Sequence, residues 1–443
     1  MRKFILPIMA SLVLLVQSCR KDEETFQTIS TSNYNSSIAR TWFDFQLKLI
    51  KETPGYSPPV AARSLGYAGV TLYEAVVPGM EGYKSLRNKI SGFDSDTFPR
   101  VVIGIEYNWS IVANAALATF QKKQFATTSS VNLIRVDSIE AVNFNALVAK
   151  YPKSDASASV EFGKRVGKAV YDYAATDGQS NASLTNFPAY VLPVGPQYWL
   201  PTGPAKTPLQ PYWGSVRPFL IASVANCQPQ GHPIYSEEVS SAFYIDSKEV
   251  YDAVTNITGP QREIAEFWSD DPGKTATPPG HAISIATQVL ETLNSNLATA
   301  AITYVKMGIA VHDAFVSCWK TKYDYPLLRP VTYIQRVIDP SFTTIISTPP
   351  FPEYTSGHSV LCGASMSIMT NLFGNNFAFS DFTHFGRTDI NGNPRNYPSF
   401  NAAGEEGAIS RLYGGIHYRF GIADGVKQGR EIGQEVIKLD LKK

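Results

Sequence analysis

Apolar residues recur three and four positions apart over much of this 443-residue chain. In the first such segment they are Ile38, Trp42, Phe45 and Leu49, and the same spacing returns over residues 162–173. This period places apolar side chains along one face of an α-helix. Few segments alternate apolar and polar residues as a half-buried strand does. The sequence therefore predicts an all-α fold made of helical bundles with long loops.

Proline marks the segment that cannot follow this helical pattern. Further helices are expected at residues 62–78, 105–122, 137–150, 237–255, 261–268, 281–296 and 298–323. Between residues 178 and 233, however, the chain places ten of its 29 prolines. Proline at this density prevents regular helix and removes backbone donors. We expect an ordered, aromatic-rich loop that either roofs a pocket or connects two helical halves, with Trp199 and Trp213 as anchors.

The N-terminus has the layout of an export signal. Residues 1–18 begin with two basic residues, continue with a short apolar run and end in Val-Gln-Ser, directly before Cys19. The apolar run is too short to span a bilayer comfortably. Together with Cys19 its end resembles a bacterial lipobox, in which the cysteine is lipidated. We expect an exported lipoprotein of the outer membrane, facing the periplasm or the cell surface, with a polar tether over residues 19–36 and no other membrane contact.

Charge and cysteine content narrow the possible partners. Thirty-nine Lys and Arg against 38 Asp and Glu leave a formal charge of +1, so no global field attracts nucleic acid. Any anion site must therefore be local. The remaining cysteines, Cys227, Cys318 and Cys362, are too few and too widely spaced for a disulfide framework or a CxxC metal site.

The first of three charged elements closes a predicted helix. The stripe of that helix consists of Ile302, Val305, Ile309, His312, Val316, Trp319 and Tyr323. His312 lies on this stripe and is expected to be a core histidine. Lys322 lies at the helix end, from where a lysine can reach into a cavity. Arg329 follows seven residues later in "KYDYPLLRP".

The second element is Ser356-Gly357-His358, directly before a small-residue apolar run. Ser356 can cap a helix, and Gly357 lets the backbone approach a ligand, so the free N–H groups there suit an oxyanion. His358 adds a group that can donate or accept a proton, which a cap alone does not need.

The third element is "SRLYGGIHYRFG", in which Arg411 precedes a glycine pair and His417. On an unbroken helix these two side chains would diverge, but the glycine pair can interrupt the helix and let them converge. The three elements then form a box for a compact tetrahedral or trigonal oxyanion. Guanidinium groups match the edges of such an anion, and lysine supplies a point charge.

The three elements, at this spacing, resemble the signature of the superfamily that joins vanadium-dependent haloperoxidases with type-2 phosphatidic acid phosphatases and bacterial acid phosphatases. The resemblance covers residues 260–435 by motif. It implies a catalytic half over residues 259–443, whereas the N-terminal helical half, residues 37–258, agrees only in general character. Thr355 replaces the proline that many members carry before Ser-Gly-His, which is expected to loosen the turn.

The haloperoxidase branch implies vanadate as cofactor, with hydrogen peroxide, halide and a small organic acceptor as partners. In that reading His417 is the ligand of vanadium and His358 moves protons. The vanadate oxygens are held by Lys322, Arg329, Ser356, the Gly357 N–H and Arg411.

The phosphatase branch remains an alternative, with His417 as a nucleophile that forms a phosphohistidine and His358 as general acid. Three features favour the peroxidase. The segments "PPFPEYTSGHS" and "HYRF" resemble the haloperoxidase versions of these motifs, and the chain is longer than a compact phosphatase requires. A third hypothesis is a non-catalytic lipoprotein that binds glycans or partners through the aromatic segment 187–213. It does not explain the three elements.

Phe351 and Trp319 are the expected walls of the pocket, with ordinary core packing as the alternative for both rings. By the resemblance, Phe351 stands where some bromide-selective members carry a second histidine and chloride-competent members an aromatic ring. It does not decide the halide, although iodide or bromide is favoured over chloride.

Other assignments are less direct. A metal-bound imidazole needs a carboxylate or carbonyl on its other nitrogen, and Asp313 and Asp424 are the candidates. In phosphatases an aspartate follows the last histidine by four residues, whereas this chain has Gly421 there. His281 is expected near the pocket mouth, and His232 and His384 in loops. Four glycines at spacing four, Gly421, Gly425, Gly429 and Gly433, predict close helix packing.

Overall fold

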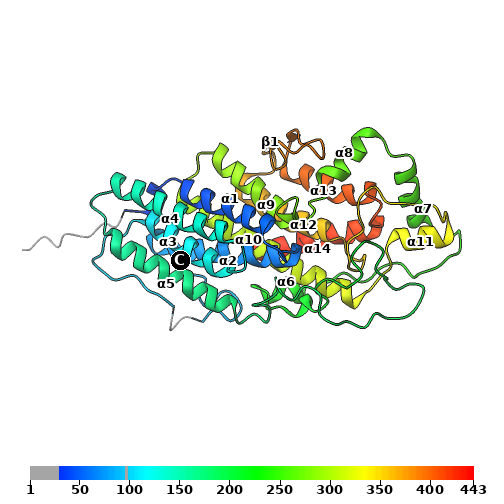
Figure 1. The fold of residues 1–443 in the computed structure, drawn as a ribbon, viewed down its shortest axis with the longest axis horizontal. Helices are drawn as coiled ribbons and strands as arrows, with labels where there is room; N and C mark the ends of the chain where they lie inside the picture. Colours follow the sequence, from blue (N-terminus) through cyan, green and yellow to red (C-terminus); the bar gives the residue numbers. More distant parts are fainter. Residues whose placement is uncertain (1–28, 95–97) are drawn as a thin grey trace, which may run out of the picture.

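The computed structural model describes residues 29–94 and 98–443. These residues form fourteen α-helices and one two-stranded antiparallel sheet, in which Phe379 pairs with Tyr397. The all-α prediction is confirmed. Figure 1 shows an elongated molecule with α3, α4 and α5 at one end and α7, α8, α11 and α13 at the other.

The elements of the first half are η1 (Thr31–Asn33), α1 (Ser37–Glu52), α2 (Pro58–Val76), η2 (Val77–Gly79), α3 (Trp109–Gln124), α4 (Ser130–Lys150), α5 (Ala156–Ala174), η3 (Trp213–Ser215), α6 (Ile221–Ala225) and α7 (Ala242–Thr255). Those of the second half are α8 (Gly259–Phe267), α9 (Thr277–Thr292), α10 (Leu297–Asp324), α11 (Pro330–Val337), α12 (Gly357–Phe373), β1 (Phe379–Asp381), β2 (Arg395–Tyr397), α13 (Phe400–Tyr413) and α14 (Arg419–Lys438). Each helix expected from the apolar spacing is present, with ends shifted by up to seven residues.

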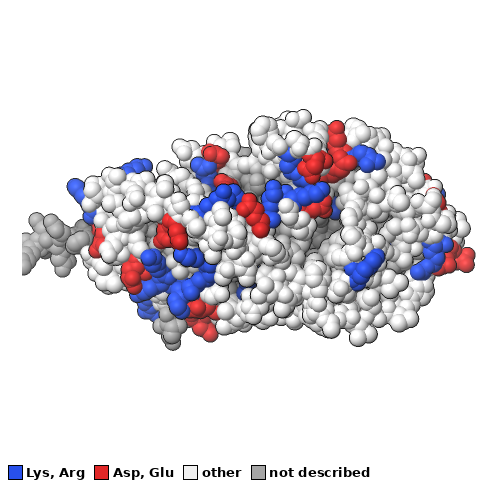
Figure 2. Space-filling model, viewed as in Figure 1, with Lys and Arg blue, Asp and Glu red and all other residues white. Residues whose placement is uncertain are grey.

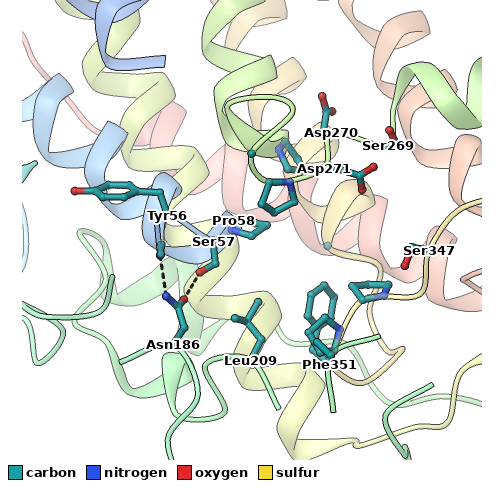
Figure 3. Close-up of a pocket in the computed structure, with 18 of the residues that line it drawn as sticks. Tyr56, Ser57, Pro58, Asn186, Leu209, Ser269, Asp270, Asp271, Ser347 and Phe351 are labelled. Carbon is teal, nitrogen blue, oxygen red and sulfur yellow. Dashed lines mark hydrogen bonds between the residues drawn. The ribbon is translucent and has the colours of Figure 1, made fainter. Parts of the chain in front are cut away.

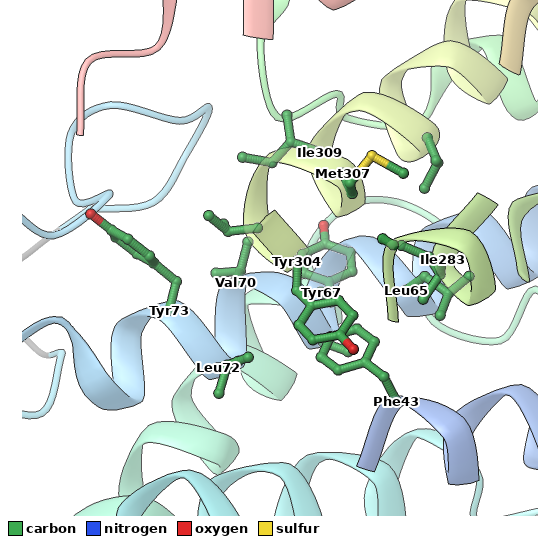
Figure 4. Close-up of a cluster of buried hydrophobic side chains, with 14 of the residues drawn as sticks. Phe43, Leu65, Tyr67, Val70, Leu72, Tyr73, Ile283, Tyr304, Met307 and Ile309 are labelled. Atoms are coloured by element: carbon green, nitrogen blue, oxygen red, sulfur yellow. The ribbon is translucent and has the colours of Figure 1, made fainter. Parts of the chain in front are cut away.

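Helix α10 is the central element of the molecule. It packs against α2 from the first half and against α12 from the second. The helix is buried all round from Thr303 to Trp319, so the predicted stripe is one part of a wholly buried surface. Figure 4 shows Tyr304 of α10 stacked on Phe43 of α1, with ring centroids 3.7 Å apart. The two halves therefore share a large hydrophobic core, and a second cluster joins α7 with α11 and the start of α14.

The glycine series allows α14 to lie directly on α12. A Cβ at Gly425 would come within 2.8 Å of Ser359 Cβ, and one at Gly433 within 2.7 Å of Ser367 Cβ. A Cβ at Gly429 would overlap the Val360 carbonyl. The predicted close helix packing is confirmed for these three positions.

The proline-rich segment is ordered and tied to the second half. Trp199 and Trp213 are buried, as expected of anchors. The Trp199 N–H donates to the Pro326 carbonyl, and the Leu209 N–H donates to the Pro350 carbonyl. The backbone of this segment therefore has a fixed position beside the loop that carries the Ser-Gly-His triad.

The signal segment 1–18 and Cys19 lie outside the described residues. Within the expected tether, Thr31 and Tyr34 are buried, and Thr31 donates a hydrogen bond to the Val76 carbonyl. Packing thus begins before residue 37. None of the described helices has the length and hydropathy needed to cross a membrane. Groups of basic and of acidic side chains both lie on the face shown in Figure 2.

Candidate active site

Lys322 lies in the last turn of α10 and is fully buried. Its ammonium donates to the carbonyls of Pro352, Glu353 and Thr355, at 2.5 to 3.0 Å. The Thr355 hydroxyl in turn donates to Gln428 on α14, at 2.7 Å. The turn before the triad is therefore held by two helices, although its proline is missing.

Arg329 precedes α11 and is also fully buried. Its guanidinium donates to the carbonyls of Phe351 and Ile416. The same group lies 3.0 Å from His417, with Nη1 facing Nε2 of the imidazole. Arg329 thus connects the loop before the triad with the last histidine.

The Ser-Gly-His triad opens α12, as the sequence predicts. Ser356 is the N-cap, and its Oγ accepts from the N–H and the hydroxyl of Ser359. A Cβ added to Gly357 would meet only Trp319, at 3.7 Å, so the glycine faces open space rather than packed atoms. His358 is buried from solvent at its Nε2, which has no hydrogen-bond partner among the described residues. The triad therefore offers free donor groups toward one cavity.

The glycine pair ends α13 and turns the chain back, as expected. Helix α13 stops at Tyr413, and Gly415 has a φ of +77°, a left-handed conformation that glycine adopts without cost. Arg411 and His417 consequently line the same cavity as Gly357 and His358. Arg411 donates to the Trp268 carbonyl at 2.7 Å, while its buried Nε has no partner among the described residues.

The carboxylate that holds His417 is Glu353. Its Oε1 lies 2.7 Å from His417 Nδ1 and also accepts the Tyr418 N–H. The two predicted candidates are wrong. Asp313 accepts the backbone N–H groups of Phe219 and Leu220, and Asp424 accepts the Tyr354 hydroxyl.

Gly421 makes the position of Glu353 possible. A Cβ at Gly421 would overlap the Glu353 carboxylate. Where phosphatases carry an aspartate, this chain therefore has a glycine that leaves room for a carboxylate from another loop. The only sequence signal for this role was a carboxylate three residues before Ser-Gly-His, and its contact with His417, 64 residues later, depends on the fold.

Burial and neighbouring charge set the protonation of the site. Burial lowers the pKa of Lys322 to about 8, and those of Arg329 and Arg411 to about 10. Burial, followed by the charge of Arg329, holds the pKa of His417 well below its usual value. The imidazole is therefore neutral, and Glu353 fixes its proton on Nδ1, which leaves a lone pair on Nε2.

The donor set suits a small, highly charged oxyanion. Three buried cations, Lys322, Arg329 and Arg411, surround His417, whereas Glu353 is the carboxylate directly bonded to it. The free N–H of Arg411, the free nitrogen of His358 and the open side of Gly357 face the same cavity. Vanadate, an oxyanion of this shape and charge, fits the residues present.

Phe351 and Trp319 both line this cavity, and their ring centroids are 4.9 Å apart. Phe351 lies 5.1 Å from both the Lys322 ammonium and the Arg329 guanidinium carbon. The two expected walls are therefore placed at the site, and they are part of the hydrophobic core as well. Figure 3 shows Phe351 among the residues around the cavity.

The other histidines are placed apart from the anion box. His312 is a buried core residue that contacts the Arg217 carbonyl, and burial lowers its pKa to about 4. His232 and His384 lie in loops, as expected. His281 does not line the cavity: it is buried behind it, between Asp270 and Asp381.

The chain is similar to proteins of one family. Residues 335–442 match the model of the second helical-bundle domain of vanadium chloroperoxidase (VCPO). No curated protein sequence matches. The crystal structure of the first bacterial vanadium-dependent iodoperoxidase is similar with a TM-score of 0.82 and 35% identity, over 93% of this chain and 98% of that one.

Two bacterial vanadium-dependent chloroperoxidase structures share the fold at lower identity. The apo form has 16% identity and a TM-score of 0.66, over 86% of this chain and 94% of that one. The holo form has 16% identity and a TM-score of 0.67, over 87% and 92%. By its anion box, its fold and this degree of similarity, the chain belongs to the family of vanadium-dependent haloperoxidases.

Proposed function

We propose that the protein is a vanadate-dependent haloperoxidase that oxidises iodide or bromide in preference to chloride. The observation that carries the proposal is the Nε2 lone pair of His417, which faces three buried cations in one box. The overall reaction consumes hydrogen peroxide, a halide and a proton and yields hypohalous acid and water. When bound, vanadate supplies Lewis-acid activation of the peroxide without a change in its own oxidation state.

The role of each residue of the anion box follows from its position. His417 offers Nε2 as the ligand atom, because Glu353 keeps the proton on Nδ1. Lys322, Arg329 and Arg411 compensate the charge of the oxyanion. Because their side chains are held by backbone carbonyls, they are already oriented when the anion arrives.

Ser356 and the Gly357 N–H are the neutral donors at the start of α12. The Ser356 hydroxyl already accepts from Ser359, so its own proton remains available to an oxygen of the anion. His358 is the proton carrier. Burial and the nearby Arg411 hold the pKa of His358 well below its usual value, so its free Nε2 can accept a proton from incoming peroxide.

The proposed halide preference rests on the apolar walls of the pocket and on the similarity to the iodoperoxidase structure. Phe351 and Trp319 form an apolar, polarisable surface beside the box, which suits a large and weakly hydrated halide. The similar iodoperoxidase structure shares 35% of its residues with this chain, against 16% for the chloroperoxidases. Iodide is also the halide that is easiest to oxidise.

The test is reconstitution of the purified, vanadate-free protein with orthovanadate, followed by peroxide and iodide, bromide or chloride in parallel. We expect vanadate-dependent formation of triiodide, slower oxidation of bromide and the slowest oxidation of chloride. His417→Ala should abolish all three reactions. His232→Ala, a loop histidine outside the box, is the matched control and should retain activity.

The same preparation tests the alternative function. In the phosphatase reading the lone pair of His417 attacks phosphorus. Rapid hydrolysis of a chromogenic phosphate monoester, without any vanadate-dependent halide oxidation, would overturn the proposal. Faster oxidation of chloride than of iodide would overturn the halide preference alone.

A further inference from the structure

Arg411 has fewer protein hydrogen bonds than the other two cations of the anion box. The Lys322 ammonium donates to three backbone carbonyls, and the Arg329 guanidinium donates to two. Among the described residues, the Trp268 carbonyl is the one hydrogen-bond acceptor of the Arg411 guanidinium, at 2.7 Å. The orientation of Arg411 toward the cavity therefore depends on where Trp268 lies.

Trp268 is the C-cap of α8. The last carbonyls of a helix have no partner within the helix, so the Trp268 carbonyl is available to Arg411. Because the helix ends there, the position of this residue depends on what its side chain contacts. The indole is 3% exposed and is held by other elements at its face and at its N–H. These two contacts therefore set the place of the carbonyl.

The face of the indole lies on His281 of α9. The two rings are nearly parallel, with 16° between their planes and 4.4 Å between their centroids. The His281 ring is fixed at both nitrogens, because Nδ1 lies 2.9 Å from Asp270 and Nε2 lies 2.7 Å from Asp381. Asp381 is a residue of β1. Strand β1 thus fixes the ring on which Trp268 stacks.

The N–H of the indole donates to Glu406 of α13, at 3.0 Å. Glu406 also accepts two hydrogen bonds from the Arg395 guanidinium and one from the Tyr397 hydroxyl, each at 2.6 Å. A bidentate contact between guanidinium and carboxylate fixes direction as well as distance. Arg395 and Tyr397 are both residues of β2. Strand β2 thus fixes the carboxylate that holds the indole N–H.

The side chains that make these contacts share one face of the two-stranded sheet. Asp381 and Arg395 are directly opposite each other in the register, and Tyr397 lies two residues beyond Arg395. Opposite residues of an antiparallel pair, and residues two apart on a strand, project to the same face. Strand β1 also packs against α9, and β2 against α13 (Figure 1). The sheet therefore contacts both helices that hold the indole.

From these contacts we infer that the β1–β2 sheet is a positioning element of the anion box. It holds the indole of Trp268 through His281 and Glu406. The Trp268 carbonyl then orients Arg411 toward the oxyanion. Among the residues that line the cavity none belongs to β1 or β2, so the sheet acts on the oxyanion through Arg411. The inference rests on the proposed function, in which Arg411 compensates the charge of vanadate.

The experiment measures binding of orthovanadate to the purified, vanadate-free protein by calorimetry, without peroxide or halide. Glu406→Gln keeps the size of the side chain but removes the charge that pairs with Arg395, so the indole is held less firmly. We expect the dissociation constant for vanadate to rise about tenfold, the lower end of the range for such supporting residues.

Glu405→Gln is the matched control. It is the same substitution at the preceding position of α13, but Glu405 is exposed, and its ion pair is with Arg430 of α14, at 3.6 Å. It should leave the affinity for vanadate unchanged.

A double-mutant cycle separates positioning from a general loss of stability. If the sheet acts through Arg411, Glu406→Gln should not weaken vanadate binding any further in a protein that already carries Arg411→Gln. A merely structural role would lower the affinity by the same factor with and without Arg411.

A second variant guards against misfolding of the first. Tyr397→Phe removes one of the hydrogen bonds that Glu406 accepts from β2 and should weaken vanadate binding about threefold, again only when Arg411 is present. If Glu406→Gln does not fold, Tyr397→Phe decides by the same cycle.

The inference is overturned if wild-type protein and the folded variants of the sheet network bind vanadate equally well. It is also overturned if Glu405→Gln weakens binding as much as Glu406→Gln, or if the loss persists in the Arg411→Gln protein. A wild-type protein that binds vanadate but oxidises no halide would instead overturn the proposed function alone.

Discussion

His417 and His281 are both buried imidazoles with a partner on each ring nitrogen, but their partners differ in charge. His281 lies between two carboxylates, with Nδ1 2.9 Å from Asp270 and Nε2 2.7 Å from Asp381. His417 has one carboxylate, Glu353, on Nδ1 and a guanidinium on Nε2. The two rings are equally buried, but their neighbours differ in charge.

The difference decides the protonation of the two rings. Although burial works against the charged form, Asp270 and Asp381 raise the pKa of His281 to about 10. For His417 burial and Arg329 act together, so its pKa falls well below the usual value. His281 is therefore an imidazolium that holds carboxylates together, whereas His417 is a neutral base whose Nε2 lone pair faces the Arg329 guanidinium.

In the His281 cluster, the positive charge of the imidazolium takes the place that a metal ion could occupy. Donor atoms of Asp270, His281 and His384 lie within 4.8 Å of one another, a spacing that a metal ion could bridge. The imidazolium already supplies positive charge between the carboxylates. In the anion box the excess charge is cationic, which an added oxyanion would balance.

The largest expected effect is the difference in unfolding free energy between alanine variants of the two histidines. His281→Ala leaves two buried carboxylates without their cation, and breaking a buried pair of this kind costs about 3–5 kcal/mol of unfolding free energy. His417→Ala should cost about 1–2 kcal/mol, because Lys322 and Arg329 still compensate Glu353. Urea unfolding at pH 7 measures both, and equal losses would contradict the assigned charges.

The next effect concerns the carboxylate on His417. Glu353→Gln replaces the carboxyl group that orients the imidazole, and loss of such a partner typically reduces metal affinity or activity about 10- to 100-fold. Halide oxidation as a function of vanadate concentration measures the change. Asp424→Asn is the control and should remain within twofold of wild type, because Asp424 contacts Tyr354 instead. The reverse order would mean that Asp424 orients His417.

A smaller effect is expected when Glu353 is displaced rather than replaced. Gly421→Ala places a methyl group against the Glu353 carboxylate and should lower vanadate-dependent activity about tenfold, the lower end of the range for such partners. Gly433→Ala overfills the α12–α14 interface away from Glu353 and should cost about 1–3 kcal/mol of stability without loss of activity per folded molecule. Full activity in Gly421→Ala would show that this glycine serves helix packing alone.

The last prediction is a pH dependence, whose effect accumulates over several pH units. Since the pKa of folded His281 is about 10, above its ordinary value of 6.5, its stabilisation is complete below pH 6.5 and is lost as the pH rises through 10. The difference in unfolding free energy between wild type and His281→Gln should therefore shrink from pH 7 to pH 10. The slope is at most about 1.4 kcal/mol per pH unit. A constant difference over this range would contradict the charged state of His281.

The anion box could be predicted from the sequence because its parts lie in short motifs. Ser356, Gly357 and His358 are adjacent, and the break between Arg411 and His417 is carried by two glycines between them. Apolar spacing likewise predicts the helices, since each needs only its own residues to define a buried face. Local patterns of this kind are visible without knowing what packs against them.

The partners of each histidine were decided by the tertiary structure. Asp313 and Asp424 were reasonable candidates by sequence, but Glu353 reaches His417 because the turn before α12 is held by Lys322 and Gly421 leaves room for the carboxylate. Nothing in the sequence places Asp381 beside His281, 100 residues away. The sequence by itself determined an α-helical chain with an oxyanion box in three motifs. Only the packing of distant segments decided which imidazole is charged and which space lies above the box, because protonation and cavity shape depend on neighbours that the chain brings together by folding.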